Sequence, residues 1–424
     1  MTTPLETVER DSPPRPRAAG RRIAYVVSLF PCYDETFILR EIKGLSERGV
    51  RLRIFSLRRR KDPVVQDDAV PFVPSTRYAS FLFSREVLGA LGRVLVRNPW
   101  PVLALIAALV KDCWRKPRTL LKSIAFLPKA ILFAEVAAGE RIEHIHAHWA
   151  SYPATVALLM SRLTGITWSF TCHAHDIFFD PSLLAGKIDA AEFALTCTAD
   201  NKRHLETVTG AAVRKVRVSY HGLDLRSFRP GPRPKGSTRL EVLAVGSLLE
   251  CKGFDILIEA VALLRKRGLD FHVTIAGGGP EEARLREAVA RHGLGAEVQL
   301  TGYVTQTDLV PLYRNADLFV LPAVLEIHWG IPNVLVEALA CHVPVITTAL
   351  PSLPELVEDG VQGLVARNRD PEDVAAKMER LLGDPEAREA MGRAGRRRVE
   401  ALFDIEKTID TVLEPLAERL DVAS

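Results

Sequence analysis

The hydrophobic and polar positions alternate between two patterns along most of the chain. Residues 22–30 and 50–57 are short apolar runs, typical of strands that are buried on both faces of a sheet. Between them, residues 35–48 repeat their apolar side chains at helical spacing, and Gly49 follows. A strand, a helix and a second strand in this order predict a βαβ unit and therefore a parallel sheet.

The alternation of strand and helix patterns resumes at about residue 144, and it resumes again after a Pro/Gly-rich segment at 229–238. Residues 229–238 lack any apolar period and predict a linker. Strands are expected at 144–149, 167–172, 194–198 and 216–220 before the linker, and at 242–246, 272–276, 298–300, 318–321, 343–347 and 364–366 after it. We therefore expect an α/β protein of two Rossmann-like doubly wound domains facing a central ligand cleft.

The expected domain limits follow from these patterns. The first domain takes in residues 21–230 and the second takes in 239–400. Residues 1–20 are polar and Pro-rich, with no apolar signal-peptide core, and predict a disordered tail. Residues 401–424 predict a final amphipathic helix that packs back toward the first domain.

Residues 82–139 depart from the α/β pattern. They predict amphipathic or apolar helices whose apolar positions are interleaved with arginines and lysines. Such helices can cover the edge and core of a sheet, or they can lie on an anionic membrane surface. The sequence leaves both alternatives open.

Composition narrows the class of protein only modestly. The 424 residues are 47% hydrophobic and 25% charged, with a net charge of +4, as in an ordinary globular protein with anionic ligands or an anionic surface as partners. The six cysteines have no CxxC spacing, which argues against a zinc site or a disulfide framework and favours a cytoplasmic protein.

Glycine-rich loops follow several of the expected strands of the second domain. Backbone amides at such loops, together with one ammonium group, can bind a diphosphate. The candidate donor-site residues in these three loops are Gly246, Ser247 and Lys252; Gly277 and Gly278; and Gly302 and Tyr303. All three loops lie where parallel strands end, which is where α/β sheets bind their ligands.

A fourth loop leads into a short helix at residues 332–340. Glu337 lies about one turn inside that helix, where its carboxylate could accept hydrogen bonds from the two hydroxyl groups of a ribose. The alternative is a solvent-exposed helix residue. The candidate ligand-binding residues of this loop and helix are Gly330, Ile331, Pro332, Asn333, Val334 and Glu337.

Histidines gather in the first domain. His144, His146 and His148 alternate along one strand, and His173 and His175 precede Asp176. Imidazole and carboxylate groups can bind a metal, but alternation is also what one face of a strand produces, and we predict no metal. The alternative is that a histidine faces the cleft and hydrogen-bonds a sugar hydroxyl, and His173 has the best position for this.

These segments together resemble a known family over nearly the whole chain, from about residue 21 to about residue 420. The motifs FPCYDETFILREI, SFTCHAHDIF, SYHGLDLRSF, VGSLLECKGFDILIEA and GIPNVLVEALACHVPVITT are similar to those of family 4 retaining glycosyltransferases of the GT-B fold, in particular bacterial exopolysaccharide (colanic-acid-type) enzymes. The resemblance implies a nucleotide-sugar donor on the second domain, an acceptor on the first, and no required metal or other cofactor. It also implies that Glu337 contacts the ribose, Lys252 the diphosphate and His173 the reacting sugar.

Two positions depart from the family pattern. The first glutamate of the family's E-x7-E signature falls at Trp329, with Glu326 nearby, and the arginine expected after Gly246 is Ser247. One carboxylate and one cation of the donor site are thus replaced. These replacements raise the alternative of a weakly active or inactive nucleotide-sugar-binding or scaffold protein.

The leading prediction is a hexosyltransferase of polysaccharide biosynthesis that uses a UDP- or GDP-hexose. Its acceptor would be a saccharide or a lipid-linked saccharide, and the protein would be cytoplasmic, with possible peripheral contact with an anionic membrane. Nucleic acid is not an expected partner. The residues assigned to the acceptor side are Glu35, His148, His175, Asp176 and His221.

Overall fold

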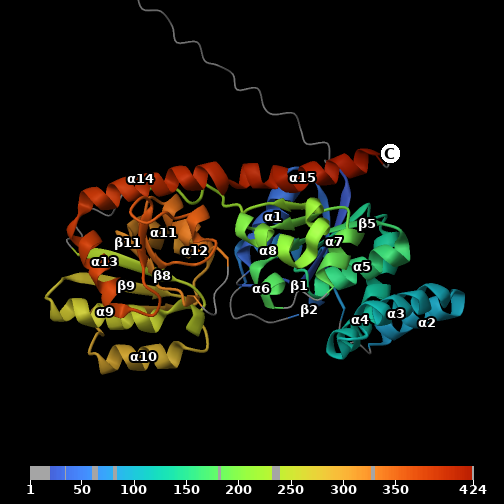
Figure 1. The fold of residues 1–424 in the computed structure, drawn as a ribbon, viewed down its shortest axis with the longest axis horizontal. Helices are drawn as coiled ribbons and strands as arrows, with labels where there is room; N and C mark the ends of the chain where they lie inside the picture. Colours follow the sequence, from blue (N-terminus) through green and yellow to red (C-terminus); the bar gives the residue numbers. More distant parts are fainter. Residues whose placement is uncertain are drawn as a thin grey trace, which may run out of the picture.

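The computed structural model describes residues 20–33, 35–59, 65–79, 84–179, 183–231, 239–325 and 330–422. Two α/β domains lie side by side, each with a parallel sheet between layers of helices (Figure 1). The predicted fold class is therefore confirmed. Residues 1–19 of the tail predicted at 1–20 lie outside the described residues, as do most of the linker, Glu326 and Trp329.

The N-terminal domain is built on a seven-stranded sheet in the order β3-β2-β1-β4-β5-β6-β7. The strands are β1 Arg22–Leu29, β2 Arg51–Arg58, β3 Thr76–Tyr78, β4 His144–His148, β5 Thr167–Cys172, β6 Ala194–Thr196 and β7 Val216–Val218. Alternation along the central strand β1 sends Tyr25 and Val27 into one core and Ala24 and Val26 into the other. Both faces of the sheet are therefore covered, as the continuous apolar runs predict.

Helices cover the two faces of this sheet. The described helices of this domain are α1 Thr36–Glu47, α2 Arg85–Arg97, α3 Trp100–Cys113, α4 Pro117–Gly139, α5 Tyr152–Thr164, α6 Ala174–Phe179, α7 Leu184–Ala190 and α8 Ala199–Thr209, with short 3-10 helices at Asp67–Phe72 and Gly210–Lys215. Helix α1 packs Ile38, Ile42 and Leu45 against the face that carries Tyr25. This packing turns the opposite side of α1, which carries Arg40, away from that core.

The segment that departs from the α/β pattern forms α2, α3 and α4. Helix α4 buries Ile131 and Phe133 in the sheet core, where the Phe133 ring lies 4.8 Å from that of Phe55. Helices α2 and α3 pack mainly on α4 and stand out from the domain (Figure 1). Among the described residues no single helix is long and apolar enough to cross a membrane; α2 and α3 reach that length only as a pair bent by 107°.

The C-terminal domain has a six-stranded sheet in the order β10-β9-β8-β11-β12-β13. Its strands are β8 Leu240–Val245, β9 Phe271–Ala276, β10 Val298–Gly302, β11 Leu318–Leu321, β12 Val345–Thr348 and β13 Gly363–Ala366. Its helices are α9 Phe254–Lys266, α10 Glu282–Arg291, α11 Gln306–Asn315, α12 Asn333–Ala340, α13 Pro371–Gly383 and α14 Pro385–Leu402, with 3-10 helices at Glu250–Lys252 and Leu353–Glu355. In this order β8 lies beside both β9 and β11, so the loops that follow these three strands lie together.

The last helix, α15 (Ile405–Val422), leaves the C-terminal domain and runs along the N-terminal one (Figure 1). Its residues Ile409, Leu413 and Leu416 are buried in the same core as α1. At the crossing, the backbone of Leu223 forms hydrogen bonds of 2.7 and 3.0 Å with Phe403 and Ile405. Helix α15 therefore ties the end of the chain to the first domain.

Hydrogen bonds also join the two domains across the cleft. The Glu355 carboxylate accepts from the amides of Ala199 and Asp200 at the start of α8, at 2.8 and 2.9 Å, and from the Tyr220 hydroxyl at 2.8 Å. A carboxylate at a helix N-terminus is a favourable partner because the first amides of a helix lack intrahelical acceptors. The structure therefore holds the two domains in direct contact.

One glycine beside the cleft provides a stability test. Gly253 has a φ of +67°, and a Cβ there would lie 2.0 Å from the Pro322 carbonyl oxygen. We expect Gly253→Ala to lower the free energy of unfolding by roughly 3 kcal/mol or more, because backbone strain and a clash add together. Gly268→Ala is the matched control, with a φ of +80° and no atom within 4 Å, and should cost only about 1 kcal/mol. Equal urea-denaturation midpoints for the two variants would contradict this expectation.

Candidate functional site

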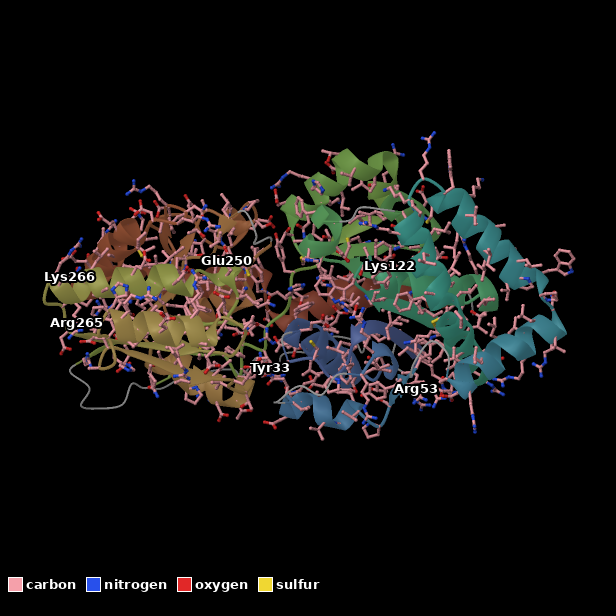
Figure 2. The ribbon with its side chains drawn as sticks, turned by 90° about the horizontal axis from the view of Figure 1, so that it is seen from below. Tyr33, Arg53, Lys122, Glu250, Arg265 and Lys266 are labelled. Atoms are coloured by element: carbon pink, nitrogen blue, oxygen red, sulfur yellow. The ribbon has the colours of Figure 1, made fainter. Side chains whose placement is uncertain are left out.

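A cavity with a volume of about 400 Å³ lies between the two domains. It opens at the carboxyl ends of β8 and β9, where a parallel α/β sheet places its ligands. Its lining residues are Tyr33, Thr36, Gln66, His175, Val245, Gly246, Ser247, Leu249, Cys251, Lys252, Ala276, Gly277, Val304, Gln306, Leu309, Pro332, Asn333, Val334 and Glu337. Both domains therefore contribute side chains to one site, and Figure 2 shows Tyr33 between them.

The first wall of the cavity consists of the loops after β8 and β9. Gly277 has a φ of +146°, and a Cβ there would lie 2.0 Å from the Gly246 carbonyl oxygen, so the two loops approach as closely as backbone allows. Ser247 and Lys252 lie beside them. Within the part of the lining that the structure describes, Lys252 is the only lysine or arginine. Its ammonium group and the nearby backbone can hold an anion.

The second wall is helix α12, which carries Asn333 and Glu337. Glu337 is only 3% exposed, so the alternative of a solvent-exposed helix residue is wrong. Its Oε2 accepts a hydrogen bond of 2.8 Å from the Tyr313 hydroxyl, and its Oε1 forms an ion pair with Arg40 of the N-terminal domain. The amide nitrogen of Gln306 lies 3.5 Å from the same Oε1. The carboxylate is therefore fixed in the wall by groups from both domains.

The buried negative charge of Glu337 affects its neighbour. Burial raises the pKa of Tyr313 well above its ordinary value, and so do the repulsion between a phenolate and the Glu337 carboxylate and the hydrogen bond that the neutral hydroxyl donates to that carboxylate. Tyr313 therefore remains a neutral hydrogen-bond donor over the whole physiological range. A ribose that bound Glu337 would share this carboxylate with Arg40 and Tyr313.

A chain of histidines connects α12 to the core of the N-terminal domain. Asn333 Oδ1 lies 3.2 Å from His221 Nδ1, His221 Nε2 lies 3.3 Å from His173 Nδ1, and His173 Nε2 lies 3.3 Å from His148 Nδ1. His148 Nε2 then lies 2.9 Å from the Glu41 carboxylate. The structure thus brings three predicted residues, His148, His173 and His221, into one hydrogen-bonded row that ends at the cavity.

Aromatic side chains hold this row in place. The Phe37 ring is stacked on His221 with centroids 4.1 Å apart, and the Trp149 ring lies 4.5 Å from that of His173. Burial lowers the pKa of His173, and it lowers that of His221 to about 4 although the hydrogen bond with Asn333 opposes the shift. Both imidazoles are neutral at pH 7, so each can donate one hydrogen bond and accept another.

The charge at the far end of the row is a carboxylate. Burial by itself would raise the pKa of Glu41, but attraction to and a hydrogen bond with His148, with smaller contributions from His146 and Tyr25, lower it to about 2. Glu41 is therefore ionised and faces His148. A buried carboxylate at the end of the row favours an imidazole orientation in which His148 Nε2 carries the proton.

His144 and His146 belong to the core rather than to the site. The ring nitrogens of His144 lie within 3.0 Å of the hydroxyl groups of Thr167 and Ser169 on the neighbouring strand β5. Those of His146 lie within 3.0 Å of the hydroxyl groups of Ser169 and Thr171 on the same strand. Burial lowers the pKa of both to about 3. Of the three histidines that alternate along β4, only His148 extends toward the cleft.

These buried neutral histidines predict an acid-sensitive fold. Their pKa values in the folded chain, about 3 for His144 and about 4 for His221, lie below the ordinary value of 6.5. The unfolded chain therefore binds protons first, and the free energy of unfolding should fall as the pH drops from about 6.5 toward 4. Urea denaturation at several pH values should show a smaller slope for His144→Gln, with the exposed His292→Gln as control. A free energy of unfolding that stays constant over this range would contradict the expectation.

The other residues predicted for the acceptor side differ in their position relative to the cavity. His175 lines the cavity, whereas Glu35 directly precedes the lining residue Thr36. Asp176 is placed differently from our expectation, because it is buried and accepts hydrogen bonds from the amides of His173, at 2.8 Å, and Ala150. Burial raises the pKa of Asp176 to about 7, although these amide hydrogen bonds oppose the shift. Its position suits fixing the loop of His173 rather than touching an acceptor.

The remaining predicted donor residues surround the cavity rather than line it. Gly278 lies in the loop after β9, and Gly302 is the last residue of β10. The Tyr303 ring meets the Tyr33 ring edge-on, with their centroids 5.0 Å apart. Gly330 and Ile331 lead into Pro332, which does line the cavity. The departure from the family pattern at Ser247 faces the cavity, and the departure at Trp329 lies outside the described residues.

Sequence reasoning missed the residues that come from α1 and α11. Arg40 and Glu41 lie in the motif FPCYDETFILREI, and Tyr313 lies in an apolar helix pattern. Two adjacent charged residues between the apolar positions Leu39 and Ile42 were the available signal. Their partners are 297 residues away for Arg40 and 107 for Glu41, so spacing could not identify them.

Two groups of side chains in the described residues come close enough to share a metal ion: His173, Cys197 and His221, and Glu41, His146 and His148. Burial raises the pKa of the Cys197 thiol to about 12, which disfavours the thiolate that a metal would need. The histidine nitrogens in both groups also lie within hydrogen-bonding distance of other side chains. Both groups are accounted for without a metal.

Comparison with known proteins agrees with this architecture. The family model described as "Glycosyl transferases group 1" matches residues 228–398. A protein of Escherichia coli (strain K12) named "Putative colanic acid biosynthesis glycosyltransferase WcaL" is 34% identical over 172 residues, 40% of this chain and 42% of that protein. D-inositol 3-phosphate glycosyltransferase 1 of Catenulispora acidiphila is 30% identical over 302 residues, 64% of this chain and 71% of that protein.

A solved structure extends the likeness in fold to both domains. HepE of Anabaena, determined in complex with UDP-glucose, superposes with a TM-score of 0.68 over 94% of this chain and 99% of that one, at 16% identity. Fold and site together define a two-domain GT-B protein with a ligand cavity between its domains. The chain belongs to the group 1 glycosyltransferases. Its match to WcaL spans less than half of that protein's length.

Proposed function

We propose that the chain is a retaining hexosyltransferase of exopolysaccharide biosynthesis that uses a UDP- or GDP-hexose. Its acceptor would be a saccharide or a lipid-linked saccharide on the cytoplasmic side. One observation carries the proposal: the cavity between the domains has Lys252 and glycine loops on one wall, and it reaches His221 and His173 through Asn333. The name of WcaL and the UDP-glucose complex of HepE support the choice of pathway and donor.

In this proposal the donor lies along the C-terminal wall. The diphosphate contacts Lys252 and the backbone near Gly246 and Gly277, and the ribose hydroxyls contact Glu337. The hexose then faces the end of the histidine row, where His221 meets Asn333 at the cavity. Both ring nitrogens of His173 lie 3.3 Å from a neighbouring histidine, so His173 would donate to a sugar hydroxyl by exchanging one of these partners for it. The bond between the sugar carbon and the diphosphate oxygen breaks as the acceptor oxygen attacks.

The single carboxylate in the described lining of the cavity favours attack from the side of the leaving group. Among the lining residues that the structure describes, Glu337 is the only carboxylate, and its oxygens are held by Arg40 and Tyr313. A second displacement through an enzyme-bound sugar would need a free nucleophile on the opposite face. We therefore propose that the acceptor attacks on the diphosphate side and that its proton passes to the departing phosphate oxygen.

A second candidate is a binding or scaffold protein with little turnover. It is favoured by Ser247, which stands in the cavity where the family pattern has an arginine. One fewer cation beside a departing diphosphate would slow the reaction by roughly a hundredfold. The two candidates differ in turnover rather than in donor binding.

The deciding experiment measures binding and turnover separately. Calorimetry with a panel of UDP-, GDP- and ADP-sugars identifies the donor, and release of the nucleoside diphosphate with membrane extract as acceptor source measures transfer. Binding with release supports the transferase, and binding without release supports the scaffold. Ser247→Arg, which restores the missing cation, should raise release only if the site is catalytic. The absence of binding to any donor would overturn both candidates.

We also propose that transfer needs no metal ion, because Lys252 and the loop amides supply positive charge beside the diphosphate. Donor turnover should persist unchanged in excess EDTA. The measurement is the rate of nucleoside diphosphate release before and after chelation. Loss of turnover that added Mg²⁺ or Mn²⁺ restores would contradict this expectation.

A further inference from the structure

Exposed apolar side chains concentrate on one part of the N-terminal domain. Among the described residues, eight of the fourteen exposed large hydrophobic side chains lie within the short stretch 88–121. We name these eight the insertion face: Leu88, Leu95, Val96, Trp100, Leu103, Val110, Trp114 and Leu121. Val96 is 86% exposed, Trp100 74% and Trp114 64%. Single exposed apolar side chains are common, but a cluster of this kind marks an interaction surface.

Helix α3 shows why the cluster is unusual. Val102, Leu105 and Leu109 form a buried stripe at helical spacing that packs into the domain core with α4. A second stripe, also at helical spacing, consists of Trp100, Leu103, Ala107, Val110 and Trp114 and faces outward. A helix that is apolar on all sides is expected to be covered on all sides. Half of α3 is therefore a surface without a partner in the described chain.

Basic residues are interleaved along the chain with the apolar residues of this surface. Residues 85–122 carry eight basic and two acidic residues, a net charge of +6, while the whole chain carries only +4. The basic residues are Arg85, Arg93, Arg97, Lys111, Arg115, Lys116, Arg118 and Lys122. The partner of this surface must therefore combine an apolar region with negative charge. A second copy of the chain docked face to face would oppose +6 with +6 and is disfavoured.

We propose that the insertion face docks on the surface of an anionic lipid bilayer. Trp100 and Trp114 enter the boundary between headgroups and acyl chains, where the indole ring is favoured because it has both an apolar body and a polar N–H. The arginines and lysines beside them contact lipid phosphates, except Arg93, which is paired with Glu135 at 2.6 Å. The opposite stripe of α3 is already packed in the core, so the helix lies in the plane of the interface.

The position of the insertion face suits an enzyme that works at a membrane. Helices α2, α3 and α4 lie at the end of the N-terminal domain that is remote from the C-terminal domain in both views (Figures 1 and 2). A bilayer on that end would leave the cavity between the domains uncovered. This inference does not depend on which donor the cavity binds or on whether the protein is an active transferase.

The test is sedimentation of the full chain with lipid vesicles. We expect binding to phosphatidylcholine vesicles that contain about one third phosphatidylglycerol, and much weaker binding to phosphatidylcholine alone. The double variant Trp100→Ser with Trp114→Ser should lose at least about tenfold in affinity. The matched control, Val208→Ser with Val361→Ser, changes two apolar side chains that are 41% exposed elsewhere and should bind as the parent does.

A second set of variants tests the contribution of positive charge to vesicle binding. Lys111→Gln with Arg118→Gln should weaken binding by roughly fivefold for each charge removed, while the exposed pair Lys266→Gln and Arg291→Gln should not. Equal thermal unfolding of all variants excludes misfolding as the cause. The proposal is overturned if the parent does not bind anionic vesicles at low salt, if the tryptophan variant binds as well as its control, or if the face instead mediates self-association or captures an acidic protein without binding lipid.

Discussion

Replacing Glu337 by alanine should abolish donor binding and lower the free energy of unfolding by roughly 3–5 kcal/mol. The effect is large because Glu337 is 3% exposed and is the acidic partner of Arg40, which is itself largely buried. Its removal leaves a buried guanidinium without this partner and takes the acceptor from the buried hydroxyl of Tyr313. Urea denaturation and donor calorimetry measure the two effects.

A double-mutant cycle separates the structural role of Glu337 from its role in the site. Arg40→Met with Glu337→Met replaces the ion pair by apolar side chains, so most of the lost stability should return. Donor binding should not return, because the carboxylate for the ribose is still missing. Recovery of donor binding in the double variant would show that Glu337 serves only to hold the two domains together.

The second large effect is expected for Lys252→Ala, which should reduce donor turnover by roughly a hundredfold or more. Lys252 is the only lysine or arginine among the described residues that line the cavity, so no nearby side chain there can take over its charge. The fold should be unaffected, since the side chain faces the cavity. The rate of nucleoside diphosphate release at saturating donor measures the change.

Lys266→Ala is the matched control for this variant. Lys266 ends helix α9 and lies at the outer end of the C-terminal domain, away from Tyr33 at the cleft (Figure 2). It should leave both donor binding and turnover unchanged. If Lys252→Ala retained full turnover, the diphosphate would have to bind elsewhere, and our placement of the donor would be wrong.

The contact between Arg40 and Glu337 also bears on how the domains move. The pair joins α1 of one domain to α12 of the other, in the wall where we place the ribose. A donor whose ribose binds the Glu337 carboxylate would compete with Arg40 for the same oxygen atoms. Donor binding and the relative position of the domains are therefore expected to be coupled, because a ligand shifts a conformational equilibrium when it contacts the two states differently.

Much of the fold follows from local patterns. The buried runs predict the strands because a strand covered on both faces needs apolar side chains at every position. The strand limits differ from prediction by a few residues. Strand β12 begins at Val345 rather than Val343, and Pro344, which has no N–H for a ladder bond, immediately precedes it. The short strand β3 was not predicted, because three residues are too few to show a hydrophobic period.

The insertion at residues 82–139 shows where pattern reasoning reaches its limit. Its helices are present, and the sequence left open whether they cover the core or face a membrane. The structure divides them: Ile131 and Phe133 of α4 enter the core, while Trp100 at the start of α3 and Trp114 just after its end are exposed. A hydropathy pattern finds apolar positions but cannot tell which of two apolar stripes has a neighbour to pack against.

The sequence by itself determined the α/β class, the two-domain order and the loops after the strands that carry Gly246, Lys252 and Glu337. These features depend on interactions between residues close together in the chain. Only the tertiary structure decided that Arg40 meets Glu337 and that His148, His173 and His221 form one row ending at Asn333. The physical reason is that helical and strand periods specify which side of an element a residue occupies, whereas its partner there depends on how distant elements pack.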